Sequence, residues 1–155
     1  MAAITSRVVE ACIFKRDHDG PTYLLLKRSV NDSIYPGMWQ LVTGSMKEGE
    51  RAVDAALRES REETAVEPLR FWVVPFVNSF YVAVNDTVHL SPVFAIEVAV
   101  NAGVSLSPEH QEYRWCTMDE AKHMLVWPGQ RTTIDLVHQY IVGGQEAARL
   151  LSVAV

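Results

Sequence analysis

The first third of the chain alternates apolar runs with short polar turns, a pattern typical of β-strands. Residues 7–16 are rich in β-branched and other apolar side chains and predict a strand. The segment from Asp17 to Pro21 is turn-forming, so residues 22–27 are expected to return as a hairpin partner. A polar loop and a short apolar piece, residues 38–43, then lead to a predicted loop at residues 44–49.

A helix is predicted over residues 50–64, followed by two long extended stretches, residues 69–84 and 87–100. Asn85 and Asp86 join these stretches and tolerate the backbone angles of a tight turn. Pro75 and Pro92 lack the N–H that a central strand donates, so sheet edges or bulges are expected there.

The remaining residues predict a loop, one strand and two helices. Residues 101–111 form the loop and residues 112–116 the strand. Thr117 and Glu120 have the spacing of a helix capping box, which predicts a helix to about residue 125. Apolar side chains at helical spacing predict a final long helix over residues 128–142, before two glycines. Together these elements indicate an α/β fold in which helices flank a mixed β-sheet, since the long antiparallel hairpin argues against a purely parallel one.

Composition limits the class of protein. The chain of 155 residues is 48% hydrophobic and 21% charged, which fits one globular domain over residues 1–155. A net charge of −5 argues against binding of extended nucleic acid but not of small phosphorylated molecules, because a bound cation inverts the local charge. Cys12 and Cys116 are expected to be buried, reduced thiols. No signal peptide or membrane-spanning stretch is evident, so a cytoplasmic protein without membrane partners is expected.

The helix predicted over residues 50–64 carries the candidate chemistry. At about 100° per residue, one arc of mostly small or apolar side chains should face the core. It consists of Val53, Ala56, Leu57, Ser60 and Thr64. Glu59, Glu62 and Glu63 share a second arc, where like charges destabilise a helix by about 0.2–0.5 kcal/mol per pair. Carboxylates grouped in this way suit a hard divalent cation. The alternative is a solvent-exposed acidic helix face whose negative charge is offset by nearby arginines.

The same segment resembles the Nudix (MutT-like) signature, G-x5-E-x7-R-E-U-x-E-E-x-G-U, where U is a bulky aliphatic residue. The matching residues are Gly44, Glu50, Arg58, Glu59, Glu62 and Glu63. Ser60 stands where an aliphatic residue is usual, Thr64 where glycine is usual, and Ala65 is a small version of the final aliphatic residue. These departures affect packing and helix termination and remove no charged group.

The resemblance extends over roughly residues 7–142. Residues 24–28 and 39–45 look like the strands that lead to a Nudix loop, and residues 109–115 look like the downstream loop and strand. Within the family, the segments around Trp39, Glu109 and Trp127, the last followed by Arg131, are similar to the dATP or dihydroneopterin triphosphate pyrophosphohydrolase branch. The resemblance implies an α/β/α sandwich and hydrolysis of a phosphoanhydride bond with Mg²⁺, or Mn²⁺ in its place.

The resemblance also implies a role for each matching residue. Glu62 and Glu63 would be metal ligands, Glu59 a ligand or general base, and the Gly44 carbonyl would complete the shell. Arg58 would orient the carboxylates, with Glu50 in a supporting role. Glu109 is favoured as a further ligand or base, with Glu112 as its alternative or a plain exposed strand residue. His110 is expected to be a hydrogen-bonded loop histidine rather than a ligand.

Substrate contacts are less specific in the sequence. The candidates are Lys27 and Arg28 for phosphates, Trp39, Tyr81 and Trp127 for stacking on a planar ring, and Arg131 for a ring edge or a phosphate. We expect a small nucleotide-like substrate, a nucleoside or pterin triphosphate cleaved to a monophosphate and pyrophosphate, and a monomer or homodimer. The alternatives are dinucleoside polyphosphates or nucleotide sugars as substrates, or a Nudix-fold module that binds nucleotides without cleaving them.

Overall fold

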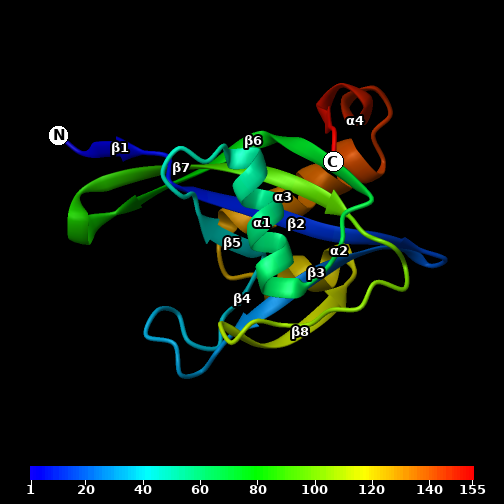
Figure 1. The fold of residues 1–155 in the computed structure, drawn as a ribbon, viewed down its shortest axis with the longest axis horizontal. Helices are drawn as coiled ribbons and strands as arrows, with labels where there is room; N and C mark the ends of the chain where they lie inside the picture. The colour runs from blue at the N-terminus through cyan, green and yellow to red at the C-terminus, as the bar shows by residue number, and fades with distance from the viewer.

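The computed structural model describes residues 1–155, and its elements follow the predicted order (Figure 1). The strands are β1 (Ala3–Thr5), β2 (Val8–Asp17), β3 (Gly20–Arg28), β4 (Trp39–Gln40), β5 (Val42–Ser45), β6 (Arg70–Val82), β7 (Thr87–Glu97), β8 (His110–Cys116) and β9 (Ser152–Val153). The helices are α1 (Ala52–Thr64), η1 (Ala83–Asn85), α2 (Met118–Met124), α3 (Pro128–Leu136), the π-helical η2 (Val137–Val142) and α4 (Glu146–Leu151).

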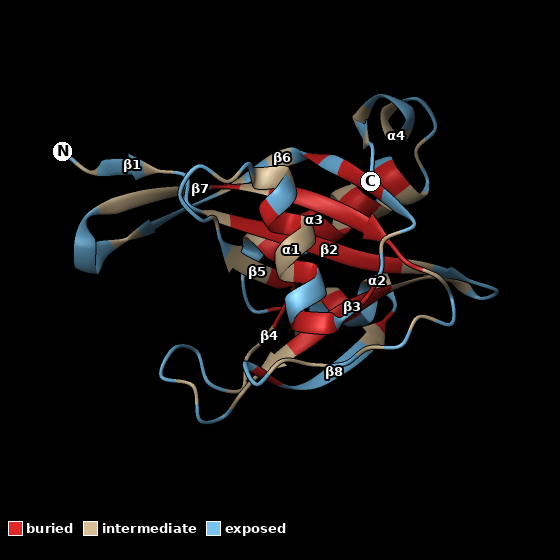
Figure 2. Ribbon diagram, in the orientation of Figure 1, coloured by how far each residue is buried: buried red, intermediate tan, exposed pale blue.

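A mixed, nine-stranded sheet forms the middle layer, which confirms the predicted α/β/α sandwich. Its main order is β4-β3-β2-β7-β6-β9; β7 is parallel to both β1 and β2, and the other pairs are antiparallel. Alternate residues of β2 point to opposite faces, so Ile13 joins the core beneath α1 and Phe14 the core beneath α2 and α3. Figure 2 shows the buried strands between these helices. No helix is both long and apolar enough to span a membrane.

The β6–β7 hairpin is interrupted where the sequence places its prolines. The pairing register shifts between Val73 and Val77, beside Pro75, and Val77 lies opposite Pro92. A proline has no N–H to donate to the ladder, and the bulge accommodates this. The turn at the tip is one turn of 3₁₀ helix, Ala83–Asn85, followed by Asp86 at φ 49°. Bulge and turn were both expected, although the turn includes a 3₁₀ helix over Ala83–Asn85 and is not confined to Asn85 and Asp86.

Two predictions differ from the structure. Gly44 and Ser45 belong to β5 rather than to the loop, since they pair with Val9 and Val8 of β2, and the loop begins only after them. The helix predicted over residues 128–142 is present as α3 and η2, which follow each other without a gap, but it is not the final element, because α4 and β9 come after the two glycines. The indole N–H of Trp72 donates to the Ala148 carbonyl (3.0 Å), so β6 holds this C-terminal segment against the sheet.

The core-facing side of α1 is rotated from the predicted arc towards the acidic arc. Its buried residues are Ala55, Ala56, Ser60, Glu63 and Thr64, whereas Val53 and Leu57 are half-buried. The small side chains of Ala55 and Ala56 let the helix lie close to the sheet. The rotation places one of the three glutamates, Glu63, in the interior, so a solvated acidic face does not describe this helix.

The end of α1 corrects the alignment of the last signature positions. Ala65, not Thr64, is the left-handed residue (φ 58°), and its N–H closes the helix on the Arg61 carbonyl (2.9 Å). Val66 is buried, at 2% exposure, and is the terminal aliphatic residue. Ala65 therefore stands where glycine is usual, and counting E-E-x-G-U from Glu62 gives the same positions, so the assignment from the sequence was one residue too early. Thr64 is an interior residue whose hydroxyl donates to the Ser60 carbonyl.

We predict that Ala65→Gly stabilises the protein. An L-residue in the left-handed region is strained by about 1–2 kcal/mol, and the greater backbone entropy of unfolded glycine offsets part of this. The expected gain is about 0.5–1 kcal/mol in the free energy of unfolding, measured by urea titration. Ala52→Gly, at the first residue of α1, is the control and should destabilise the protein. A loss of stability in Ala65→Gly would contradict this account of the helix end.

Candidate active site on helix α1

Arg58 is the centre of a charged network that joins α1 to the segment before it. Its Nε and Nη2 donate to the two carboxylate oxygens of Glu50 (2.7 and 2.9 Å), and Nη2 also donates to the Ser45 carbonyl (2.9 Å). Its Nη1 donates to Glu59 (2.9 Å) and Glu62 (3.1 Å). Charge-assisted, bidentate contacts of this kind fix the orientation of carboxylates. The geometry is the one expected of a residue that orients the acidic side chains.

Glu50 lies before the helix, which begins at Ala52 and not at residue 50 as predicted. Besides pairing with Arg58, one of its oxygens accepts the backbone N–H of Lys47 (2.8 Å), which closes the loop between β5 and α1. The hydrogen bonds from Arg58 and then from Lys47 lower the pKa of Glu50 to about 2. Glu50 is therefore committed to the network, in agreement with a supporting position.

Gly44 lies directly against Glu59. A β-carbon on Gly44 would lie 2.1 Å from Cδ of Glu59, so only glycine lets the carboxylate occupy this place over β5. The Glu59 side chain is mostly enclosed, at 14% exposure, between Gly44 and Arg58. This close approach explains why the segment requires glycine at a position whose backbone angles are ordinary.

Glu63 is brought together with Glu109 and His110 from the far side of the sequence. Each offers one ligand atom, and these atoms lie within 4.8 Å of one another. Backbone hydrogen bonds hold the group together, because the Ser107 N–H donates to the Glu63 carbonyl (3.2 Å) and the Ser29 N–H donates to the Glu109 carbonyl (3.0 Å). The sequence identified Glu109 but set His110 aside, and His110 is the first residue of β8 rather than a loop residue.

The carboxyl group of Glu63 lacks a partner inside the protein. Glu63 is 2% exposed, and its Oε2 is buried without a hydrogen bond. Burial, and then the negative charge of Glu109, raise the pKa of Glu63 to about 9. A divalent cation would supply the missing partner, and the nearby carboxylate oxygens are the ligands that Mg²⁺ prefers. The residues present therefore fit such an ion.

The three glutamates of the predicted strip are not equivalent. Glu63 is buried, Glu59 is enclosed against Gly44, and the side chain of Glu62 is 55% exposed. The three positions of the predicted strip therefore differ in burial. Because α1 is rotated towards the sheet, Glu63 lies innermost, Glu59 in the middle and Glu62 outermost. Arg58 contacts Glu59 and Glu62.

The cations expected at the phosphates have partners of their own. The Lys27 ammonium lies 3.7 Å from Glu112, and Arg28 binds Asp32 and donates to the Ile34 carbonyl (2.8 Å). The side chain of Glu112 is 54% exposed on β8, and it is not part of the group formed by Glu63, Glu109 and His110. Arg28 lies next to the acidic group, because its residue pairs with His110 across β3 and β8.

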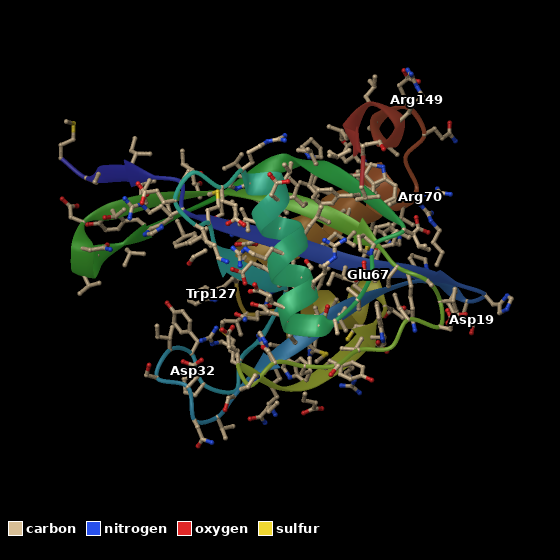
Figure 3. All side chains as sticks on the ribbon, in the orientation of Figure 1. Asp19, Asp32, Glu67, Arg70, Trp127 and Arg149 are labelled. Carbon is tan, nitrogen blue, oxygen red and sulfur yellow. The ribbon has the colours of Figure 1, made fainter.

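The aromatic residues predicted to stack on a substrate ring lie in separate parts of the molecule. Trp127 makes an edge contact with Tyr35 of the loop after β3 (5.3 Å between ring centroids), and Figure 3 shows Trp127 on the side of the molecule where Asp32 of that loop lies. Arg131 donates to the Leu125 carbonyl (2.7 Å), which fixes the start of α3.

Trp39 is partly buried against the core beneath α3. Tyr81 lies near the tip of the β6–β7 hairpin, which projects away from α1 (Figure 1), and its hydroxyl donates to Asp86 of the same tip (3.0 Å). The structure does not bring Tyr81 to the acidic group.

Comparison with known proteins places this site in context. The sequence model of the NUDIX domain matches residues 6–137. The asymmetrical bis(5′-nucleosyl)-tetraphosphatase of Mus musculus is 31% identical over 132 residues, which are 82% of this chain and 85% of that protein. The nucleoside triphosphatase NudI of Klebsiella pneumoniae subsp. pneumoniae is 26% identical over 121 residues, 74% of this chain and 86% of that protein.

Solved structures share the fold. An Ap4A hydrolase of C. elegans, determined as a binary complex, superposes with a TM-score of 0.74 at 19% identity. The match covers 88% of this chain and 97% of that one. At this identity the likeness supports the architecture alone.

We predict that Gly44→Ala weakens divalent-cation binding without unfolding the protein. The added β-carbon displaces the flexible Glu59 side chain from Arg58. The expected result is a loss of about 10–100-fold in affinity for Mg²⁺, the range typical when groups that position ligands are removed, measured by calorimetric titration. Gly103→Ala is the matched control, because open space surrounds Gly103. Unchanged Mg²⁺ affinity in Gly44→Ala would refute a role for this contact.

Proposed function

This chain belongs to the Nudix family, and from that membership we propose that it is a magnesium-dependent hydrolase that cuts a phosphoanhydride bond of a nucleotide-like substrate. The observation that carries the proposal is the buried, unpartnered carboxylate of Glu63 beside Glu109, at the end of a helix whose other acids are held by Arg58.

The proposed ligands are the carboxylates of Glu63 and Glu109, with Glu59 and Glu62 next to them on α1 and the Gly44 carbonyl at the edge of β5. When bound, a divalent cation neutralises charge on the phosphate oxygens and lowers the pKa of a coordinated water. Glu63 is buried and Glu62 is exposed, so the carboxylates of α1 extend from the protein interior to the solvent. Mn²⁺ would serve in place of Mg²⁺ with the same oxygen donors.

Arg58 and Glu59 are the residues proposed to act on the attacking water. Glu59 accepts its proton as general base, and Arg58 holds the Glu59 carboxylate in place through Nη1. Because Arg58 remains paired with Glu50, the guanidinium cannot swing away from the helix. Water then forms a new bond to one phosphorus, the bridging P–O bond breaks, and the leaving phosphate group carries away the electron pair.

We favour a nucleoside triphosphate as substrate, cleaved to a nucleoside monophosphate and pyrophosphate. The 26% identical relative named as a nucleoside triphosphatase supports this choice. Trp127, which is 40% exposed beside Tyr35, is the aromatic surface proposed to take a planar base, and Arg28 lies next to the acidic group for a phosphate.

A dinucleoside tetraphosphate is the second candidate, and one observation favours it. The relative with 31% identity over 82% of this chain is named as an asymmetrical bis(5′-nucleosyl)-tetraphosphatase. The same attack on this substrate gives a nucleoside triphosphate and a monophosphate, so the released products distinguish the two candidates.

We predict that Glu63→Gln reduces hydrolysis by more than about 100-fold while the protein stays folded, because a ligand contributes more than the positioning groups whose loss costs 10–100-fold. Turnover is measured as monophosphate release with Mg²⁺, and folding by circular dichroism. Glu67→Gln is the control: Glu67 follows the same helix, is labelled in Figure 3, and its exposed side chain pairs with Arg61. Undiminished turnover in Glu63→Gln would remove Glu63 from the proposed site.

The substrate is decided by a screen of nucleoside, deoxynucleoside and pterin triphosphates, dinucleoside tetraphosphates and nucleotide sugars with Mg²⁺, with both products identified. Pyrophosphate release from a triphosphate is the expected result. A triphosphate product from a dinucleoside tetraphosphate, at higher kcat/KM, would establish the second candidate. Binding of nucleotides without any cleavage would indicate a module that has the fold but not the activity.

A further inference from the structure

Two titratable side chains at the proposed cation site each have a buried polar atom without a partner. One such atom is Oε2 of Glu63, which needs a donor while it is ionised, and the other is Nδ1 of His110. Glu63 is 2% exposed and His110 is 5% exposed, so water does not satisfy these atoms from bulk solvent. A ring nitrogen of His110 lies within 4.8 Å of a carboxylate oxygen of Glu63. Unpaired polar groups in an interior cost free energy and call for an explanation.

Gln40 determines which imidazole nitrogen carries the proton. The side-chain amide nitrogen of Gln40 lies 2.9 Å from Nε2 of His110, and an amide –NH₂ can only donate. Nε2 is therefore the acceptor. An imidazole ring keeps at least one proton on its two nitrogens, and Nε2 has none because it accepts the hydrogen bond from Gln40. That proton is on Nδ1, the nitrogen without a partner.

The imidazole is held from several sides. The His110 backbone N–H donates to the Ser107 carbonyl (3.2 Å), and the Ser107 N–H donates to the carbonyl of Glu63 itself (3.2 Å). On the opposite side, Gln40 belongs to β4, which pairs with β3, and β3 also pairs with β8. The ring is thus fixed between the edge of the sheet and the last turn of α1.

We propose that His110 is a positioning residue that holds Glu63 through a hydrogen bond from Nδ1–H to Oε2, in a chain that runs from Gln40 to His110 to Glu63. The inference rests on the proposed function of Glu63 as a cation ligand. With Oε2 held by His110, the other oxygen of Glu63 is presented towards Glu109 and the cation. Hydrogen bonds of this kind orient metal-binding carboxylates and raise metal affinity.

The same chain excludes His110 as a direct ligand. A nitrogen that carries a proton has no lone pair for a metal, and Nε2 is used by the Gln40 amide. The site therefore keeps oxygen ligands, which suits Mg²⁺, although a histidine lies within the group.

Two substitutions separate the functions of the two nitrogens. His110→Asn keeps a donor near the place of Nδ1, whereas His110→Gln keeps an acceptor near the place of Nε2 for Gln40 but loses the donor to Glu63. The probe is Mn²⁺ alone, followed by electron paramagnetic resonance without substrate. We expect His110→Gln to lose about 10–100-fold in Mn²⁺ affinity and His110→Asn to stay within about threefold of the wild-type chain. Equal affinity in all three proteins, or equal losses in both variants, would overturn the proposal.

A second measurement uses the wild-type protein and does not depend on how the variants fold. In ¹⁵N-histidine spectra, the His110 signals are expected to show a protonated Nδ1 and an unprotonated Nε2, with and without Mg²⁺. The opposite tautomer would overturn the proposal.

Mn²⁺ binding by Glu63→Gln distinguishes a failure of this inference from a failure of the proposed cation site. If the wild-type chain binds no Mn²⁺, or Glu63→Gln binds it equally well, the proposed cation site fails and the role of His110 fails with it. If Glu63→Gln loses Mn²⁺ binding but His110→Gln does not, only the role of His110 is overturned.

Discussion

The guanidinium of Arg58 connects three neighbouring parts of the molecule through hydrogen bonds. Through Glu50 and Ser45 it holds the loop before α1 and the end of β5, and through Glu59 and Glu62 it holds the outer face of the helix. A planar cation that stays charged at all relevant pH values is suited to this task, because its donors point in fixed directions. Without it, Glu59 and Glu62 would repel each other on the outer side of the helix. With it, the same charges become an ordered acidic edge.

Glu63 stands outside this network and is held by different means. It is buried against the sheet, near a second carboxylate, and the elevated pKa shows how unfavourable its charge is there without a counter-ion. A buried ionised carboxylate is tolerated only when it is paired or binds a metal. The fold thus maintains a buried carboxyl group whose ionised form is stabilised by a bound cation. We regard this deficit of positive charge, rather than the number of acids on the helix, as the physical basis of cation binding.

Packing explains why the helix can serve both groups. Ala55 and Ala56 bring α1 close to the sheet, and Gly44 makes room for Glu59 at the point of closest approach. Because the helix lies so near, the loop that carries Glu109 can hydrogen-bond to its last turn. The small side chains at the contact between helix and sheet therefore determine where the charged side chains lie. The same closeness leaves the hydroxyl of Ser60 buried without a partner, a feature for which the structure offers no functional reason.

Local patterns in the sequence were sufficient for the order of strands and helices, the mixed sheet, the capping box at Thr117 and the spacing of Arg58 with its glutamates, because each depends on residues a few positions apart. The rotation of α1, the extension of β5 through Ser45, and the added elements α4 and β9 depended on contacts between distant segments. The same is true of the site. The sequence could name Glu63 and Glu109, but only the tertiary structure decided that Glu63 is inside, that Glu62 is outside, and that His110 lies beside the buried carboxylate with Gln40 behind it. A helical period gives the angle between side chains on one helix; which side faces the sheet is decided by how closely the two can pack.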